Sequence, residues 1–253
     1  MKGLLREFIR SLIKEAGAAA ERQETGFVRL VNKHAKRAPK GITVISNDRE
    51  VDKVTGAEKF QGRAASGSEP YTDIVIHTKV DNFNVSAKGP TAPSIAGGGL
   101  SGMEELVPGL IGSFLEAAEE WYLDNGYEAG DIIPDIYGQL NDEDKMTIVI
   151  GSEEIGGPID LMYIGPMDVS GDYDKMHQEL TVSGALIDSE DFADDHDIYL
   201  RLRKRRSDQP FVPGEKDSRG LPLILGKSPS RGDRGRRVVV TKQVPASANV
   251  VEF

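Results

Sequence analysis

The sequence contains no cysteine. Disulfides, thiolate metal sites and a cysteine nucleophile are therefore excluded, and a cytoplasmic setting fits this composition. The chain also lacks the roughly 18 consecutive apolar residues that a membrane-spanning helix needs. Its first stretch, MKGLLREFIRSLIKEA, has charged side chains throughout and so lacks the uninterrupted apolar segment of a secretory signal. We expect a soluble protein that does not bind membranes.

Basic residues are scarce in the middle of the chain. Among its 253 residues, those at 100–198 include 25 Asp and Glu but only two Lys, whereas residues 199–253 include 13 Lys and Arg against five acids. Charge separated in this way can steer the approach of polyelectrolytes, or the two regions can neutralise each other within the folded chain. Both interpretations stay open at this point.

Hydrophobic periodicity predicts a mixed α/β or α+β protein with its helices early and many of its strands late. Helices are expected over 4–15, 24–38 and 103–125, with a linker at 17–20 and a short helical segment possible at 57–60. Strands are expected over 41–46, 72–78, 83–88, 146–151, 179–188, 197–206 and 236–244, with at least one more within 156–171. The helix at 4–15 is amphipathic, which suits docking on the protein's own core or on a second copy in a homo-oligomer.

The stretch SEPYTDIVIHTKVDNFNVSAKG, residues 68–89, reads as a β-hairpin. Strand alternation across its turn places one set of side chains on a common polar face: Asp73, Val75, His77, Asn84, Ser86 and Lys88. The opposite face is wholly apolar and must pack on a core. Asp73 is expected opposite Lys88 or one diagonal step from it. The polar face is either a solvated surface or the two halves of an active site.

The order of elements around this hairpin resembles the PD-(D/E)xK, or restriction-endonuclease-like, nuclease superfamily. The motifs that carry the resemblance are Pro70-Tyr-Thr-Asp73 and Ser86-Ala87-Lys88, and it covers residues 21–151. It implies a mixed sheet flanked by helices. The chain departs from the family pattern at Ser86, where the triplet normally has Asp or Glu. The resemblance divides the chain into an amphipathic helix at 1–20, a nuclease-like core at 21–151 and a β-rich region with a basic tail at 152–253.

The resemblance also implies a chemistry for these residues. Asp73 would be a ligand of Mg²⁺, and Lys88 would position the attacking water. The carboxylate that Ser86 lacks would come from Glu24 as a second metal ligand, with Glu21 and Glu69 as other candidates. A hydroxyl binds a hard divalent cation less well than a carboxylate does.

Arginines are concentrated near the C-terminus. LRLRKRR at 200–206 and GKSPSRGDRGRR at 226–237 contain the candidate nucleic-acid contacts Arg201, Arg203, Arg205, Arg231, Arg234, Arg236 and Arg237. Alternation places the first three on one strand face. Guanidinium groups match phosphate geometry, so a nucleic acid, most simply DNA, is the expected partner. The competing interpretation pairs these arginines with the acidic middle of the chain.

Two classes of function follow. The first is a metal-dependent endonuclease that binds or hydrolyses DNA through Asp73, Lys88 and Glu24. The second is a non-catalytic viral or phage structural or assembly protein, located in the host cytoplasm, that docks its partners through the basic C-terminal segment. A nuclease fold that retains binding without hydrolysis lies between the two.

Overall fold

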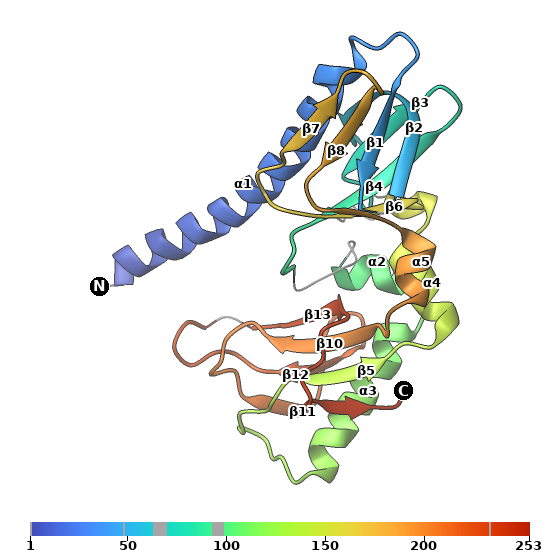
Figure 1. Ribbon diagram of the computed structural model, residues 1–253. Helices are drawn as coiled ribbons and strands as arrows, with labels where there is room; N and C mark the ends of the chain where they lie inside the picture. The colour runs from blue at the N-terminus through green and yellow to red at the C-terminus, as the bar shows by residue number, and fades with distance from the viewer. Residues whose placement is uncertain (1, 48, 63–69, 93–98, 233) are drawn as a thin grey trace. The chain divides into compact units, whose positions relative to one another are not determined.

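The computed structural model describes residues 2–47, 49–62, 70–92, 99–232 and 234–253 (Figure 1). These residues form a mixed α/β protein with five α-helices and a large mixed sheet. The chain divides into two compact units. Unit 1 consists of the described parts of Met1–Gly62, Pro70–Ala92 and Gly156–Phe192, and unit 2 is built mainly from those of Pro93–Ile155 and Ala193–Phe253.

Unit 1 consists of one long helix and an eight-stranded sheet. Its elements are α1 (Lys2–Ala35), β1 (Ile42–Ser46), β2 (Arg49–Lys59), β3 (Ile74–Thr78), β4 (Asn82–Lys88), β6 (Leu161–Ile164), β7 (Gly171–Asp174), β8 (Glu179–Val182) and β9 (Ala185–Asp188). The strand order is β7-β8-β1-β2-β3-β4-β6-β9, with parallel pairs at β1–β8 and β4–β6. The remaining pairs are antiparallel, and short turns join β1 to β2, β3 to β4 and β7 to β8.

Helix α1 packs on this sheet through an apolar stripe, and Figure 1 shows it running along one side of the strands. Phe27, Val31 and Ala35 recur every four residues on one face and are buried against the strands. The ring of Phe27 lies 5.0 Å from that of Tyr163 on β6. This packing fixes the orientation of the second half of α1 on the sheet.

Unit 2 holds the remaining elements. They are α2 (Gly99–Leu106), α3 (Leu110–Asp124), β5 (Ile136–Gln139), α4 (Asp142–Ile150), η1 (Glu153–Ile155), β10 (Tyr199–Lys204), β11 (Phe211–Lys216), β12 (Pro222–Leu225), β13 (Arg236–Thr241) and β14 (Asn249–Val251). A four-stranded sheet has the order β13-β10-β5-β14, and β11 pairs with β12. Helix α5 (Ser189–Asp194) follows β9 and leads from unit 1 into unit 2.

Close packing at Gly138 joins α3 to the four-stranded sheet. A Cβ atom there would lie 2.5 Å from the ring of Phe253 and 2.8 Å from that of Phe114, so only glycine fits. The two rings are 5.3 Å apart. Buried Phe114 of α3 and partly exposed Phe253 therefore pack on β5 at this glycine.

The strand predicted at 146–151 is wrong, because these residues belong to helix α4. Asn141 caps the helix by accepting a hydrogen bond from the Asp144 backbone N–H at 2.9 Å. Three acidic residues then occupy the first turn, where the helix dipole favours negative charge. The cap and this charge outweigh the β-propensity of the MTIVIG run.

The predicted helices also differ from those observed. The two helices expected at the N-terminus form one continuous helix, α1. The alanines at 18–20 favour helix, and the single glycine of the predicted linker lowers helix stability by only about 1 kcal/mol. The helix predicted over 103–125 is broken in two at Pro108 and Gly109, which has φ +85°.

Residues 57–59 belong to β2 and not to a helix. Ala57 pairs with Ile76 of β3, and its backbone exchanges two hydrogen bonds with the Asn32 side chain of α1. The run 179–188 forms two strands that turn at Gly184, at φ +93°. Each unit combines stretches that are distant in the sequence, and the predicted limits at 20, 151 and 152 stay predictions.

Candidate active site

Three chain segments meet at one end of the sheet of unit 1. Lys59 is the last residue of β2, Asp73 immediately precedes β3, and Lys88 is the last residue of β4. Because the three strands pair in antiparallel order, these positions lie at the same end of the sheet. The register pairs Ile74 with Val85, and the Asp73 N–H donates to the Val85 carbonyl at 2.9 Å. The predicted division of the hairpin into a polar and an apolar face is confirmed.

Asp73 is tied to β4 by one carboxylate oxygen. Its Oδ2 accepts hydrogen bonds from the Ala87 N–H at 2.6 Å and from the Ser86 hydroxyl at 3.2 Å. Lys88 Nζ lies 3.7 Å from the same oxygen, and both charged side chains are more than four-fifths buried. Asp73 and Lys88 are thus one diagonal step apart, as the sequence predicted. Ser86 is 2% exposed and serves as a donor to Asp73.

Helix α1 crosses this end of the sheet and adds two side chains. Gln23, which is 1% exposed, donates from Nε2 to the carbonyl oxygens of Lys88 at 3.2 Å and Gly165 at 2.8 Å. Sequence reasoning missed Gln23, although its spacing of four from Phe27 marks a polar residue within the buried stripe. Glu24 follows it in the chain. Gln23 therefore anchors both the end of β4 and the helix turn that carries Glu24.

Glu24 forms an ion pair with Lys59, which sequence reasoning also missed. Lys59 Nζ lies 2.9 Å from Glu24 Oε2 and 3.9 Å from Glu21 Oε1. Burial is the main cause that raises the pKa of Glu24 above its usual value, and the negative charges of Asp73 and Glu21 raise it further, although the hydrogen bond from Lys59 lowers it. That hydrogen bond is the main cause that raises the pKa of Lys59. The negative charge of Asp73 therefore disfavours the ionised form of Glu24, in addition to burial.

The charges at this end are nearly balanced. The carboxylates of Glu21, Glu24 and Asp73 face the ammonium groups of Lys59 and Lys88. Among the described residues, no hydrogen bond reaches Asp73 Oδ1 or Glu24 Oε1, and no group of three or more His, Cys, Asp or Glu is arranged to hold a metal ion. Glu69 lies outside the described residues.

His77 lies at the other end of the hairpin. Its Nδ1 is 2.9 Å from Asn82 Oδ1 and its Nε2 is 3.3 Å from Glu58 Oε1. It is an outward-facing histidine with partners of its own, one of the two roles that the sequence allowed.

Carboxylates pair with several of the C-terminal arginines. Arg201 Nη2 lies 2.6 Å from Asp135 Oδ2, with its guanidinium 5.4 Å from the centre of the Tyr137 ring. Arg234 lies 2.6 Å from Glu215. The Arg236 side chain is 3% exposed and 3.2 Å from Asp217, so in this conformation it is not available to a nucleic acid.

The other arginines of this group differ from these three in their ion pairing. Arg203 shares a face of β10 with Arg201, whereas Arg205 follows the end of the strand, so the expected row of three is a row of two. Within the described chain, the side chains of Arg203, Arg205 and Arg231 have no carboxylate partner. The side chain of Arg237 lies outside the description. Of these three ion pairs, only Arg201–Asp135 joins the basic tail to the acidic middle of the chain, and the nucleic-acid interpretation stays a prediction.

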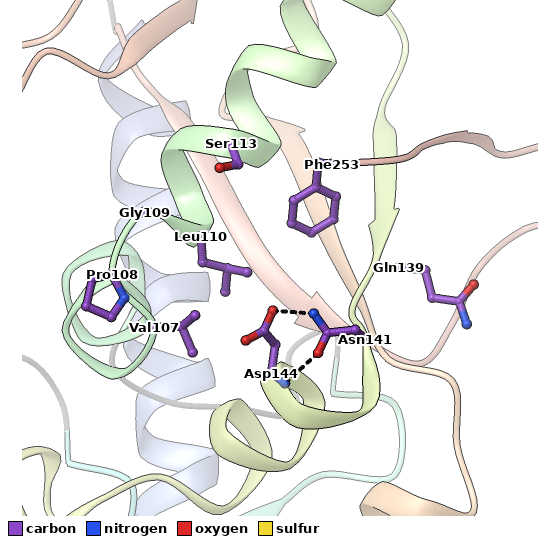
Figure 2. A pocket seen from close by; sticks show the side chains of 9 residues that line it. All are labelled: Val107, Pro108, Gly109, Leu110, Ser113, Gln139, Asn141, Asp144 and Phe253. Atoms are coloured by element: carbon purple, nitrogen blue, oxygen red, sulfur yellow. Dashed lines mark hydrogen bonds between the residues drawn. The ribbon is translucent and has the colours of Figure 1, made fainter.

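A separate pocket of about 290 Å³ lies within unit 2, between the turn joining α2 to α3, the end of β5 and the start of α4 (Figure 2). Figure 2 shows the two hydrogen bonds between Asp144 and Asn141. The Asp144 carboxylate accepts from Asn141 Nδ2 at 2.7 Å, and the Asp144 backbone N–H donates to Asn141 Oδ1 at 2.9 Å. Its other lining is largely apolar, including Leu110 and Phe253. The main polar groups of this pocket cap a helix, and none of the hairpin residues lines it.

Comparisons with protein-family models, with curated proteins and with solved structures find no match to this chain. None of its helices, over the residues that the structure describes, is both long and apolar enough to cross a membrane.

Proposed function

We propose that the protein is a metal-dependent nuclease whose active site is the end of the sheet formed by Lys59, Asp73 and Lys88 beneath helix α1. One observation carries this proposal: Asp73 and Lys88, at the ends of neighbouring strands, lie 3.7 Å apart in a largely buried setting. Charged side chains that the fold holds largely out of water are often found at functional sites.

Each side chain has a chemical role in this proposal. Asp73 and Glu24 would hold Mg²⁺ through their free oxygens. The bound ion would offset charge on a phosphodiester and acidify a water molecule. Lys88 would orient that water and stabilise the negative charge that develops on phosphorus. Ser86 and the Ala87 N–H fix the carboxylate of Asp73, and Gln23 fixes the backbone of Lys88.

The proposed substrate is DNA, bound through its phosphates. Arg203, Arg205 and Arg231 supply guanidinium groups. Arg201, Arg234 and Arg236 instead form ion pairs with Asp135, Glu215 and Asp217.

A second candidate is a nuclease-like protein that binds nucleic acid without cleaving it. Two observations favour it: Ser86 brings no charge to the site, and Lys59 already neutralises Glu24. A viral assembly role would likewise need no hydrolysis.

Plasmid nicking separates these candidates. Supercoiled DNA is incubated with the wild type, Asp73→Asn and Lys88→Met in Mg²⁺, Mn²⁺ or EDTA. Lys79→Met is the matched control, since Lys79 is exposed in the turn of the same hairpin. We expect metal-dependent nicking that both site variants lower by roughly 100-fold and the control leaves unchanged. Nicking that persists in Asp73→Asn would refute the assignment of the site, and binding without nicking on several DNA forms would favour the second candidate.

A further inference from the structure

One buried glutamine of unit 2 holds two chain segments together. Gln209 is fully buried, and its Nε2 donates to the carbonyl oxygens of Gly226 at 3.2 Å and Gly235 at 2.9 Å. Its Oε1 accepts from the Arg206 N–H at 2.8 Å. Gly226 follows β12 and Gly235 precedes β13. The Gln209 side chain therefore binds both ends of the connection between these strands to the turn that follows β10.

A second contact fixes the middle of this connection. The Ser230 N–H donates to Asp208 Oδ2 at 3.1 Å, next to Gln209 in the turn. Hydrogen bonds from the Ser230 and Ser228 hydroxyls lower the pKa of Asp208 to about 2, so its carboxylate stays ionised at neutral pH. We call residues 226–232 the basic loop. The loop is held at its start by Gln209 and near its middle by Asp208.

This arrangement gathers positive charge that the protein does not neutralise. Five cations in and beside the two segments have no carboxylate partner among the described residues: Arg203, Lys204, Arg205, Lys227 and Arg231. The strand register also pairs Arg203 with Arg237 and Lys204 with Arg236. Like charges directly opposite each other destabilise a strand pair. The stability of the fold does not require such a cluster, and an anionic partner would relieve its repulsion.

We propose that the basic loop and the end of β10 form a docking surface for the phosphate backbone of double-stranded DNA, with Gln209 as its positioning residue. This inference rests on the proposed function for the identity of the partner. It concerns another part of the molecule, because the surface lies in unit 2 and requires neither a metal ion nor hydrolysis.

The residues of this surface favour phosphates over bases and over lipids. Guanidinium groups match the oxygens of a phosphate in a bidentate geometry. Residues 203–209 and 226–232 contain no aromatic side chain on which an unpaired base could stack, and Tyr137 is only 3% exposed. They also contain no large apolar side chain that could insert into a membrane. A duplex should therefore bind at least as well as a single strand, with little dependence on sequence.

Fluorescence anisotropy of a short labelled duplex tests the inference in EDTA, where metal-dependent cleavage does not occur. The affinity is measured against salt concentration for the wild type, Arg205→Gln, Arg231→Gln and the double variant. Arg29→Gln is the matched control, because Arg29 is an exposed arginine on α1 of unit 1. Each single variant should weaken duplex binding roughly tenfold in about 0.1 M salt and lower the salt slope by about 0.9. The control should match the wild type.

Replacement of Gln209 tests the positioning role, because Gln209→Met removes the hydrogen bonds and leaves every charge in place. With unit 2 shown to be folded by Trp121 fluorescence, we expect severalfold weaker duplex binding, since the loop then has to be ordered on binding. Gln209→Glu keeps the acceptor for the Arg206 N–H and replaces Gln209→Met if that variant unfolds. Wild-type affinity in a folded Gln209 variant would overturn the positioning role.

The outcomes separate this inference from the proposed function. Duplex binding that neither arginine variant weakens would overturn the docking surface and leave the nuclease site to the nicking assay of Asp73→Asn and Lys88→Met. Binding that both arginine variants weaken, without any nicking, would support the surface and overturn the nuclease. A tenfold preference for the single strand, or binding to phosphatidylserine vesicles but not to the duplex, would overturn duplex DNA as the partner. Failure of the wild type to bind any of these would overturn the surface and DNA as the substrate together.

Discussion

Replacement of Asp73 by alanine and by asparagine should separate its structural role from its chemical one. Asp73→Ala removes the acceptor of the Ala87 N–H and of the Ser86 hydroxyl, which is 2% exposed. Losing a hydrogen bond to a charged acceptor and leaving buried donors unpaired costs about 1.5–3 kcal/mol. Relief of the repulsion with Glu24 offsets part of this cost. We therefore expect about 2 kcal/mol of destabilisation for alanine.

Asparagine keeps an oxygen that can accept from the Ala87 N–H, so its cost should be below about 1 kcal/mol. Both variants remove the charge that would hold a metal ion, and both should lose metal-dependent nicking. A nuclease assay on Asp73→Ala alone would confuse the two effects. Asp73→Asn is therefore the informative variant for function, and Asp73→Ala is informative for the fold.

Hydrogen exchange measured peptide by peptide is the appropriate assay, because the two units can unfold separately. Peptides from β4 report on unit 1, while fluorescence of Trp121, the only tryptophan, reports on unit 2. A loss of 2 kcal/mol corresponds to exchange about 30-fold faster in β4. Unchanged exchange in Asp73→Ala, or equal losses in the two variants, would refute the hydrogen-bonding argument.

Two further predictions concern buried charge. Asp217→Ala leaves the buried guanidinium of Arg236 without its partner and should destabilise unit 2 by about 3 kcal/mol, as followed by urea unfolding with Trp121 fluorescence. Adding Arg236→Met should recover most of that loss, and a double variant as unstable as the single one would contradict the ion-pair argument. In EDTA, Glu24→Gln should be at least as stable as the wild type at neutral pH. Because the pKa of Glu24 is raised in the folded protein, its charged form lowers the stability of the fold at neutral pH, and glutamine removes this cost. The stability advantage of Glu24→Gln should vanish as the pH falls below the usual pKa of 4.5, where Glu24 is protonated in both the folded and the unfolded state. A stability advantage of Glu24→Gln that increased toward low pH would contradict a raised pKa of Glu24.

The hairpin could be predicted because its information is local. Alternation of apolar and polar residues over 73–88 fixes which side chains share a face, and a short turn fixes the register. The proximity of Asp73 and Lys88 follows from these two facts alone. In the same way, the spacing of Phe27, Val31 and Ala35 identifies the face of α1 that packs on the sheet.

Helix α4 and the pairing of the arginines could not be predicted in this way. The residues MTIVIG have strand propensity, but the cap at Asn141 and the acidic first turn favour a helix. Whether an arginine faces solvent or a carboxylate depends on segments far apart in sequence, such as Asp135 and Arg201. Composition shows which charged residues the chain contains, but not which of them form ion pairs.

By itself the sequence determined the local periodicities: the apolar stripe of α1, the two faces of the hairpin and the clustering of basic residues near the end of the chain. Only the tertiary structure decided that α1 crosses the end of the sheet, where Gln23 holds the backbone of Lys88 and Lys59 neutralises Glu24. The physical reason is that alternation and helical spacing act between near neighbours. The pairing of charges instead depends on which surfaces the burial of Phe27 and Val31 brings together.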